Sequence, residues 1–359
     1  MFCIEKKEYN LQDNFLEIDS FEIKSHPQNY SVEWDKSASA EIFITKLITE
    51  NSDAVFLIDR NVFETYNFKN LGIKKSLIIN AIEENKTIDI VISLVDFLSS
   101  CNFTKADTLI VIGGGIIQDI AAFTAKSYKR GINWIFVPTT LLSMCDSCIG
   151  GKCALNHGNT KNQLALFSAP SKVIINSNFL KTLGSKEIKS GFGEILKLGI
   201  TGGEDTFNLY RELVKKGNVE NFEDFKPLIL MALHVKKVII EDDEFESGLR
   251  QSLNYGHTIG HALEILSNYE LPHGQAVALG IILVNRLNSD EIEREKIELL
   301  ASDLIDNINI NIDPQKFQEL LRKDKKTLGN KVKFITINII GDMNFLELEN
   351  NNDLLARIK

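Results

Sequence analysis

The sequence of 359 residues contains no apolar run approaching the roughly 18 to 20 residues that a membrane-spanning helix needs. Its first residues mix Glu5, Lys6, Lys7 and Glu8 and lack the apolar stretch of a signal peptide. There is also no basic excess, and a formal net charge of -9 argues against binding nucleic acid through overall charge. We therefore expect a cytoplasmic protein with small-molecule partners, no membrane association and no nucleic-acid partner.

Cysteine is scarce, and its odd count of five is typical of reduced thiols rather than of a disulfide framework. Cys145 and Cys148 have the spacing of a metal-binding or redox pair, but only Cys153 follows them, so the second pair of a zinc ribbon is missing. We expect small buried thiols in a loop. Internal repeats and low-complexity segments are absent too.

The first half of the chain alternates short apolar runs with helical patterns, which predicts a parallel sheet. The predicted strands are residues 54–58, 108–112 and 134–137, and the predicted helices between and after them are residues 88–98 and 117–128. Residues 21–24 and 30–34 alternate as an opening hairpin. Residues 1–15 have no clear period and are interpreted as an extension.

From about Phe179 the apolar spacing is mostly helical, and a strand is predicted again at 332–340. The predicted helices are residues 188–200, 205–214, 225–240, 252–266, 275–287 and 292–304. We therefore predict an α/β domain over residues 1–175, including the extension, and a mostly α-helical domain over residues 176–359.

Three consecutive glycines, Gly113, Gly114 and Gly115, follow a predicted buried strand and precede a predicted helix. At such a turn, backbone N–H groups and the helix dipole can approach a pyrophosphate. The pattern is not the full G-x-G-x-x-G fingerprint, and glycines there often only permit a tight turn. Asp59, at the end of an earlier strand, stands where a ribose-binding carboxylate would, and a helix N-cap is the alternative.

Histidine is also scarce, yet three of the six histidines lie within 17 residues. His257 and His261 are at i and i+4, on one helical face, and His273 opens the next helix, where a turn can bring it back. Isolated histidines are more often satisfied core or surface groups. Three of them, with Glu194 as an oxygen ligand, predict a zinc-like catalytic site, into which Lys197 points from the same helical face as Glu194.

A series of motifs in this chain resembles, in order, those of the 3-dehydroquinate synthases, which are sugar-phosphate cyclases. They include Gly-Gly-Gly-Ile-Ile-Gln-Asp at 113–119 and Asn-Tyr-Gly-His-Thr-Ile-Gly-His at 254–261. The others are residues 130–131, 138–142, 146–147, 150–152, 161–162, 190–197, 246–250 and 273–274. Gln118, where the family usually has glycine, is among several departures that indicate a divergent member.

The resemblance implies a Rossmann-like N-terminal domain that binds NAD, a helical domain that binds metal and substrate, and an active site in the cleft between them. It implies Zn²⁺ or Co²⁺ held by Glu194, His257 and His273, with His261 as acid/base and Glu246, Lys197 and Lys152 as further catalytic groups. The implied NAD contacts are Asp59, Asn61, Glu83, Lys86, Gly113, Gly114, Gly115, Asp119, Thr139, Thr140, Lys161 and the segment from Phe179 to Thr182.

The implied reaction converts 3-deoxy-arabino-heptulosonate 7-phosphate to 3-dehydroquinate, a step of the shikimate pathway, with elimination of phosphate. The implied substrate contacts are Asp146, Lys152, Asn162, Lys197, Lys236, Arg250, Asn254, Lys325 or Lys326, and Arg130 supplied by the second subunit of a homodimer. One alternative is a related cyclase acting on sedoheptulose 7-phosphate or glucose 6-phosphate. The others are a metal-dependent polyol dehydrogenase and a non-catalytic paralogue.

Overall fold

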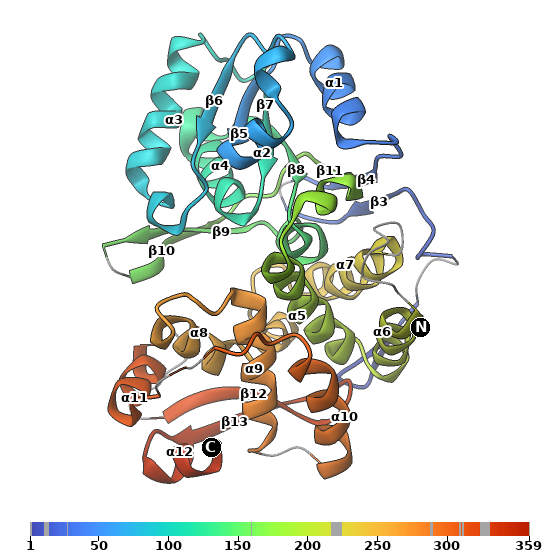
Figure 1. Cartoon of the computed structure of the whole chain (residues 1–359), viewed down its shortest axis with the longest axis vertical. Coiled ribbons are helices and arrows are strands. Elements are labelled where there is room, and N and C mark those ends of the chain that lie inside the picture. Colours follow the sequence, from blue (N-terminus) through green and yellow to red (C-terminus); the bar gives the residue numbers. More distant parts are fainter. Residues whose placement is uncertain are drawn as a thin grey trace. The chain divides into compact units, whose positions relative to one another are not determined.

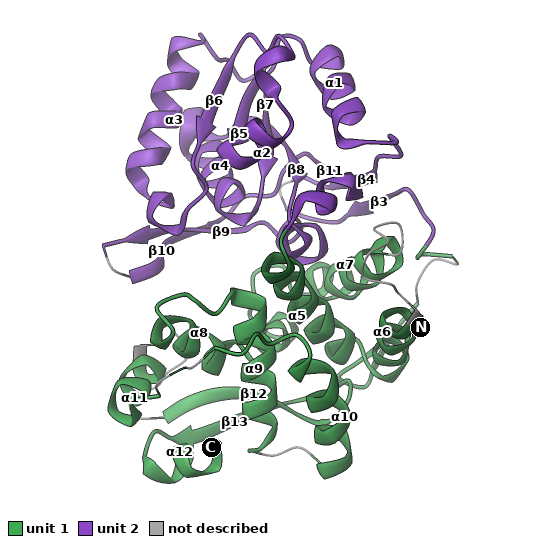
Figure 2. Cartoon of the chain, in the orientation of Figure 1, with its two compact units in different colours: residues 1–16, 184–359 green, residues 17–183 purple. Residues whose placement is uncertain are grey.

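A computed structural model of the chain describes residues 2–10, 14–26, 28–158, 160–216, 225–287, 290–308, 310, 312–323 and 331–358. The chain divides into two compact units, here called unit 1 (residues 1–16 and 184–359) and unit 2 (residues 17–183), coloured separately in Figure 2. The division therefore follows Leu183 rather than residue 175, and the first 16 residues group with the C-terminal unit instead of the N-terminal one.

Unit 2 is built on a seven-stranded sheet with the order β3-β4-β11-β8-β7-β5-β6 (Figure 1). Its strands are β3 (Ser20–Ile23), β4 (Tyr30–Trp34), β5 (Val55–Asp59), β6 (Ser76–Ile79), β7 (Thr108–Gly113), β8 (Asn133–Pro138) and β11 (Lys172–Ile175). Only β3 and β4 pair antiparallel; the other neighbours are parallel. The apolar runs in β5 and β7 are buried almost throughout, as expected for central parallel strands.

Helices and a separate hairpin complete unit 2. The α-helices are α1 (Ala40–Glu50), α2 (Arg60–Thr65), α3 (Ile88–Ser100) and α4 (Gly115–Ser127). Short helical turns are η1 (Phe68–Asn70), η2 (Glu83–Asn85), η3 (Tyr128–Arg130), η4 (Ser143–Ser147) and η5 (Ser177–Thr182), and the hairpin is β9 (Lys152–His157) with β10 (Thr160–Phe167). Because α4 begins directly after β7, which pairs in parallel with β5 and β8, its first residues lie at the carboxyl edge of these strands.

The strand order reverses beside β5, and this places the predicted cofactor residues together. The chain passes from β5 to β6 on one side, then returns to add β7 on the other. Ile58 of β5 pairs with Ile112 of β7, so Asp59 and Gly113 leave neighbouring strands at the same edge of the sheet. In open α/β sheets, such a switch point is where ligands bind.

Unit 1 is mainly helical. Its elements are β1 (Phe2–Ile4), β2 (Lys7–Tyr9), α5 (Ser185–Thr201), α6 (Glu204–Lys216), α7 (Phe225–Asp242), η7 (Leu249–Asn254), α8 (His257–Leu266), α9 (His273–Asn285), α10 (Glu291–Ser302), α11 (Pro314–Lys323), β12 (Lys331–Ile339), β13 (Asp342–Glu349) and α12 (Asn352–Ile358). The predicted α/β class with a helical C-terminal region is confirmed. Among the described residues, no helix combines the length and apolarity that crossing a bilayer requires.

One sequence prediction for unit 1 is wrong in detail. The helix predicted over residues 252–266 is broken, because Gly256 adopts a left-handed φ of 77° and separates η7 from α8. Residues 1–15, interpreted as an extension without a clear period, include an antiparallel hairpin formed by Phe2–Ile4 and Lys7–Tyr9. This hairpin is held in unit 1 by the hydrogen bond from the amide of Glu5 to the carbonyl of Gly341 at 3.1 Å.

Cys145, Cys148 and Cys153 are buried thiols, as predicted, although they do not share one loop. Cys145 lies in η4, Cys148 directly after it, and Cys153 in β9. The thiol of Cys153 is 3.6 Å from the carbonyl of Leu166 on β10, and burial raises the pKa of this thiol. A protonated, buried thiol is a poor nucleophile, which agrees with a packing role.

Candidate active site

The glycine turn at 113–115 is tight on the side facing β8. A Cβ atom on Gly114 would lie 3.0 Å from the methyl group of Thr140, and the amide of Thr139 donates to the carbonyl of Gly113 at 3.0 Å. The turn leads directly into α4, whose first amides are unpaired within the helix. Backbone N–H groups at the start of α4 are therefore available to a phosphate group at the carboxyl edge of the sheet.

Lys86 is the centre of a charged cluster beside this turn. Its ammonium group, on a side chain only 9% exposed, lies 3.1 Å from Asp119 on α4, 3.5 Å from Glu83 in η2 and 2.8 Å from the side-chain oxygen of Asn162. Burial would lower the pKa of Lys86, but Asp119 and Glu83 outweigh it and raise this pKa. Lys161 adds a second cation 3.7 Å from Glu83. The structure thus brings together four predicted cofactor residues and one predicted substrate residue.

Other predicted cofactor residues have local structural roles. Asp59 is the N-cap of α2 and accepts a hydrogen bond from the amide of Asn61 at 3.0 Å, which is the capping alternative considered above. A carboxylate has further acceptor positions, so this cap does not exclude a ribose contact. Phe179 is a core residue, packed against Phe43 and Tyr66, so only its backbone could face a ligand. The hydroxyl of Thr182 is 3.1 Å from that of Tyr66.

Glycines bring three helices of unit 1 into backbone contact. A Cβ atom on Gly193 of α5 would lie 2.0 Å from the carbonyl oxygen of Gly274 on α9, and one on Gly260 of α8 would lie 2.9 Å from that of Ala276 on α9. Larger residues would push the helices apart. This close approach places the side chains of Glu194, His257 and His273, one from each helix, around one point.

Glu194 lies at that point and is 1% exposed. Its Oε1 atom is 3.5 Å from Nε2 of His257 and 3.1 Å from Nε2 of His273, while Oε2 is 2.5 Å from the ammonium group of Lys197. Burial would raise the pKa of Glu194, but Lys197 and the imidazoles hold it well below its usual range. Glu194 is therefore a buried anion surrounded by nitrogen atoms.

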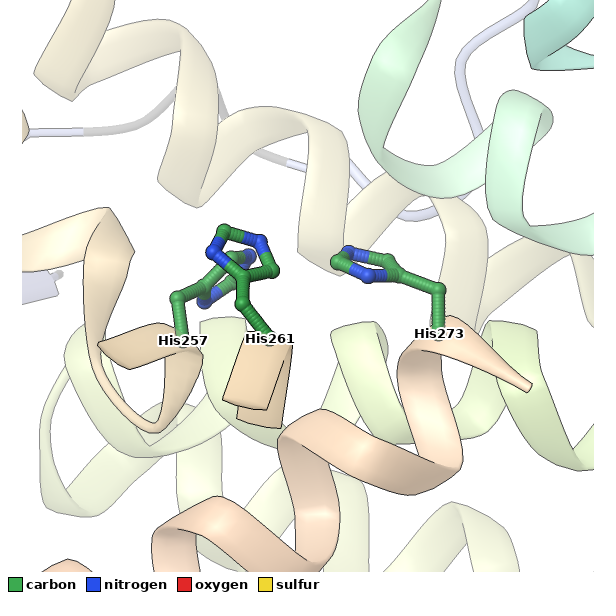
Figure 3. Close-up of side chains that lie close together, drawn as sticks. All are labelled: His257, His261 and His273. Atoms are coloured by element: carbon green, nitrogen blue, oxygen red, sulfur yellow. The ribbon is translucent and has the colours of Figure 1, made fainter. Parts of the chain in front are cut away.

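The imidazoles of His257, His261 and His273 face a common space, as Figure 3 shows, and one nitrogen from each lies within 4.8 Å of the others. Nδ1 of His257 is 3.1 Å from the carbonyl of Tyr255, and Nδ1 of His273 is 3.2 Å from Glu264. A neutral imidazole has a single N–H, yet both rings meet an oxygen at each nitrogen. A cation between Glu194 and the two Nε2 atoms resolves this conflict, and protons do so in its absence.

The pKa values of the two rings differ because their surroundings differ. Burial would lower the pKa of His273, but the charge of Glu264 and hydrogen bonds to Glu194 and Glu264 outweigh it and raise this pKa. Burial lowers the pKa of His257 despite the attraction to Glu194. Oxygen acceptors at Nδ1 with Nε2 directed inward are typical of metal-binding histidines, so this donor set fits a divalent cation.

The predicted substrate and catalytic residues are distributed over both units. In unit 2, Lys152 opens β9, Asp146 lies in η4, and Arg130 is exposed with a left-handed φ of 63°. In unit 1, Lys236 on α7 is 7% exposed and Arg250 in η7 is 1% exposed, while Asn254 donates to the carboxylate of Glu246 at 2.6 Å. Lys325 and Lys326 lie outside the described residues.

Three residues that sequence reasoning did not single out organise these groups. Glu264 holds His273, and its position seven residues after His257, on the same helical face, is a signal that could have revealed it. Asp243 accepts from the amides of Ser247, Gly248 and Arg250 in the loop that carries Glu246. Asn156 of β9 bonds to two distant segments, and no local sequence pattern indicates this.

Comparison with known proteins connects this geometry to a family. The models of the 3-dehydroquinate synthase N-terminal and C-terminal regions match residues 76–190 and 191–327. The 3-dehydroquinate synthase of Crocosphaera subtropica is 36% identical in an alignment 292 residues long, which covers 78% of this chain and 80% of the relative. That of Streptococcus pneumoniae is 30% identical over 94% of this chain and 99% of the relative.

Solved structures show the same fold at lower identity. A 2-deoxy-scyllo-inosose synthase complexed with carbaglucose-6-phosphate, NAD⁺ and Co²⁺ has a TM-score of 0.78 at 20% identity, covering 94% of this chain and 98% of that one. A 2-epi-5-epi-valiolone synthase from Streptomyces hygroscopicus with NAD⁺ and Zn²⁺ has a TM-score of 0.79 at 22% identity, covering 93% and 97%. The chain belongs to the 3-dehydroquinate synthase family.

Proposed function

We propose that this protein is an NAD- and divalent-metal-dependent cyclase that converts 3-deoxy-arabino-heptulosonate 7-phosphate to 3-dehydroquinate with elimination of phosphate. The observation that carries the proposal is the buried Glu194 carboxylate, which Lys197 and the Nε2 atoms of His257 and His273 surround in a chain of this family. Glu194, His257 and His273 would hold Zn²⁺ or Co²⁺, and His261 would remain as the acid/base.

The residues of unit 2 fit NAD. The glycine turn at 113–115 lies at the switch point of the sheet, and Thr139 and Thr140 border it. Glu83, Lys86, Asp119 and Lys161 form a charged cluster close to α4. When bound, NAD would take up and return a hydride while the metal ion polarises a substrate oxygen.

The chain's own side chains would orient the substrate and move protons. Lys152, Asn162 and Lys197 would bind the phosphate group, and Lys236, Arg250 and Asn254 would bind the carboxylate, which supplies orientation more than bond-making. His261 is exposed, so its imidazole could exchange a proton with a substrate group. Glu246, bonded to Asn254, would act beside the carboxylate.

Cyclases acting on sedoheptulose 7-phosphate or glucose 6-phosphate are the alternative, and their substrates lack a carboxylate. The presence of Lys236, Arg250 and Asn254 in this chain favours the carboxylate-bearing substrate. A polyol dehydrogenase would have no use for a phosphate clamp formed by Lys152, Asn162 and Lys197. A non-catalytic paralogue is disfavoured because every proposed ligand and acid/base residue is present.

The deciding experiment incubates the protein with NAD, Zn²⁺ or Co²⁺ and each of the three sugar phosphates, and measures inorganic phosphate and NADH. The heptulosonate phosphate should release phosphate without net formation of NADH, because a cyclase regenerates NAD in each turnover. Phosphate release only from sedoheptulose 7-phosphate or glucose 6-phosphate would replace the proposed substrate. NADH accumulating in proportion to product would identify a dehydrogenase, and no turnover with any of them would support the paralogue.

We also propose a homodimer in which Arg130 reaches the substrate of the other subunit. Lys129, Arg130 and Gly131 have φ values of 49°, 63° and 109°, an unusual succession of left-handed residues that presents the exposed Arg130 at the end of η3. Mixing inactive Arg130→Ala and His261→Ala proteins should restore part of the activity, since one site of a mixed dimer then has both intact residues. Sedimentation as a monomer, or no recovery on mixing, would contradict it.

A further inference from the structure

Asn156 lies where the β9–β10 hairpin meets the segment that carries Glu83 and Lys86. Its amide donates to the carbonyl of Lys86 at 2.7 Å, and Asn156 forms an isolated parallel bridge with Thr87. The backbone of Asn156 is therefore fixed against the segment that joins η2 to α3. This leaves its side chain between Glu83 on one side and the end of the hairpin on the other.

The side-chain amide of Asn156 uses both of its ends. Nδ2 donates to the carboxylate of Glu83 at 2.9 Å and to the carbonyl of Glu83 at 3.1 Å, while Oδ1 accepts from the backbone amide of Asn162 at 3.0 Å. The amide cannot be reversed, because an ionised Glu83 only accepts and the N–H of Asn162 only donates. Asn156 thus joins two residues that are far apart in the sequence.

Asn162 requires such support because its backbone is irregular. It has a left-handed φ of 56°, and the β9–β10 register shifts between Thr160 and Leu164 around it. Its side-chain oxygen accepts from Lys86 at 2.8 Å, and Lys86 in turn lies 3.5 Å from Glu83. Asn156, Glu83, Lys86 and Asn162 therefore form a closed ring of polar contacts.

We propose that Asn156 is a positioning residue that couples the NAD contacts Glu83 and Lys86 to the substrate contact Asn162. This inference rests on the proposed function for the roles of those three residues. Because one side chain fixes both groups, NAD bound at Glu83 orders Asn162, and substrate bound at Asn162 orders Glu83. Binding of one ligand therefore strengthens binding of the other, and thermodynamic linkage makes this effect equal in both directions.

Two substitutions separate the two ends of the side chain. Asn156→Ala removes every hydrogen bond of this side chain. NAD affinity should fall and substrate KM should rise, each by about tenfold, which is the effect of one or two lost hydrogen bonds. Asn156→Asp keeps an acceptor for the amide of Asn162 but places a carboxylate against Glu83. NAD affinity should then fall by about tenfold, whereas substrate KM at saturating NAD stays within about twofold of wild type.

Asn85→Ala is the matched control. Asn85 lies in the same segment, and its side chain donates to the carbonyl of Asn80 at 2.8 Å, so this bond stays within the segment. Asn85→Ala should change neither constant by more than about twofold. Equal losses in Asn85→Ala and Asn156→Ala would mean general loosening of the segment and would overturn the proposal. Equal effects of Asn156→Asp on both ligands would overturn it as well.

Hydrogen exchange in the free, full-length protein tests the same link without any ligand. Deuterium uptake in the peptide containing Asn162 should be faster in Asn156→Ala and unchanged in Asn156→Asp, because only the alanine variant leaves that amide without its acceptor. Unchanged uptake in the alanine variant would refute the positioning role even if the enzyme is active. Failure of wild-type protein to bind NAD or release phosphate would instead refute the proposed function, while the exchange result still decides the role of Asn156.

Discussion

The carboxylate of Glu264 lies 3.2 Å from Nδ1 of His273, while Nε2 of the same ring is 3.1 Å from Glu194. Glu264 therefore determines which nitrogen of His273 carries the proton and which faces the proposed metal ion. Glu264→Gln should weaken Zn²⁺ affinity by roughly 10- to 100-fold, the usual effect of removing such a partner. Competition with a chromophoric chelator measures this directly. Glu270→Gln, at an exposed position nearby, should leave the affinity unchanged; equal affinities for both variants would contradict the role of Glu264.

Substitution of single histidines distinguishes ligand from acid/base, because three imidazoles share the site. His273→Ala and His257→Ala should lose bound metal and activity together while the protein remains folded. His261→Ala should retain stoichiometric metal but lose roughly 10²- to 10⁴-fold in turnover, the contribution typical of a general acid or base. Metal analysis of the purified proteins and kcat check this. Full metal content in His273→Ala, or none in His261→Ala, would show that the ligand set is wrong.

The contact between α5 and α9 predicts that Gly193 tolerates no side chain. In Gly193→Ala the new Cβ would lie 2.0 Å from the carbonyl oxygen of Gly274, so the helices must separate, and we expect destabilisation of at least about 2 kcal/mol. Gly199 is the matched control in the same helix, since its Cβ would meet Tyr210 at 3.4 Å, an ordinary contact. Gly199→Ala should be neutral or stabilising by up to about 1 kcal/mol. Thermal and denaturant unfolding compare them; equal stabilities would refute this packing.

Asp243 is expected to set the position of the loop that carries Glu246 and of Arg250 at the start of η7. Its two carboxylate oxygens accept from the amides of Ser247, Gly248 and Arg250 at 2.8 to 3.0 Å. Asp243→Ala should raise KM for the carboxylate-bearing substrate by about tenfold or more, and Asp243→Asn should recover part of the loss because it keeps one acceptor.

Direct loss of the guanidinium in Arg250→Ala should cost roughly 2 to 4 kcal/mol of substrate affinity, the range for truncating one partner of a buried charge pair.

Asp242→Ala is the matched control for Asp243→Ala. It removes the neighbouring carboxylate, which pairs with Lys7 near the surface. Steady-state kinetics decide both cases. If Asp242→Ala and Asp243→Ala behave alike, the loop does not depend on the Asp243 carboxylate.

Asp119, whose side chain is 21% exposed, gives unit 2 a specific dependence on pH. Burial outweighs attraction to Lys86 and raises the pKa of Asp119 from 3.8 to about 6. A folded-state pKa above that of the unfolded chain means that the protonated form favours folding. This stabilisation is complete below about pH 3.8 and is lost as pH rises through about 6.

Comparison with Asp119→Asn isolates this effect, because acids distant from Asp119 titrate alike in both proteins. Relative to the variant, wild type should lose up to about 3 kcal/mol of unfolding free energy between about pH 4 and about pH 7. Asp107→Asn provides a control of opposite sign, since hydrogen bonds from Thr104 lower the pKa of the Asp107 carboxyl. Denaturant unfolding without NAD measures both, and parallel pH profiles for wild type and Asp119→Asn would contradict the prediction.

Sequence patterns predicted the central parallel strands β5, β7 and β8 and most of the long helices. The apolar runs at 54–58 and 108–112 correspond to β5 and β7, because a strand covered on both faces needs an uninterrupted apolar run. The strands β6 and β10 were missed. The four residues of β6 are too few to show a period, and β10 is largely exposed and polar, so neither has the pattern of a buried strand.

The candidate metal site was predicted in part. The clustering of His257, His261 and His273, with Glu194 as an oxygen ligand, predicted a metal site. The family motifs then assigned Glu194, His257 and His273 as its ligands and left His261 as the acid/base. Neither source predicted that Glu264 holds His273 or that Asn156 joins Glu83 to Asn162. Those contacts connect residues on different elements, and hydrogen bonds between distant segments leave no periodic signal in a sequence.

The sequence by itself determined the family, the central parallel strands, most of the long helices, and the residue types available to hold a cation and a phosphate. These follow from local spacing and from motifs that survive in linear order. Only the tertiary structure decided which oxygen faces each imidazole nitrogen. It also decided that Gly256 interrupts the predicted helix and that the first residues belong to the C-terminal unit. Such features depend on which distant backbones approach one another closely, and that is settled by packing rather than by any one segment.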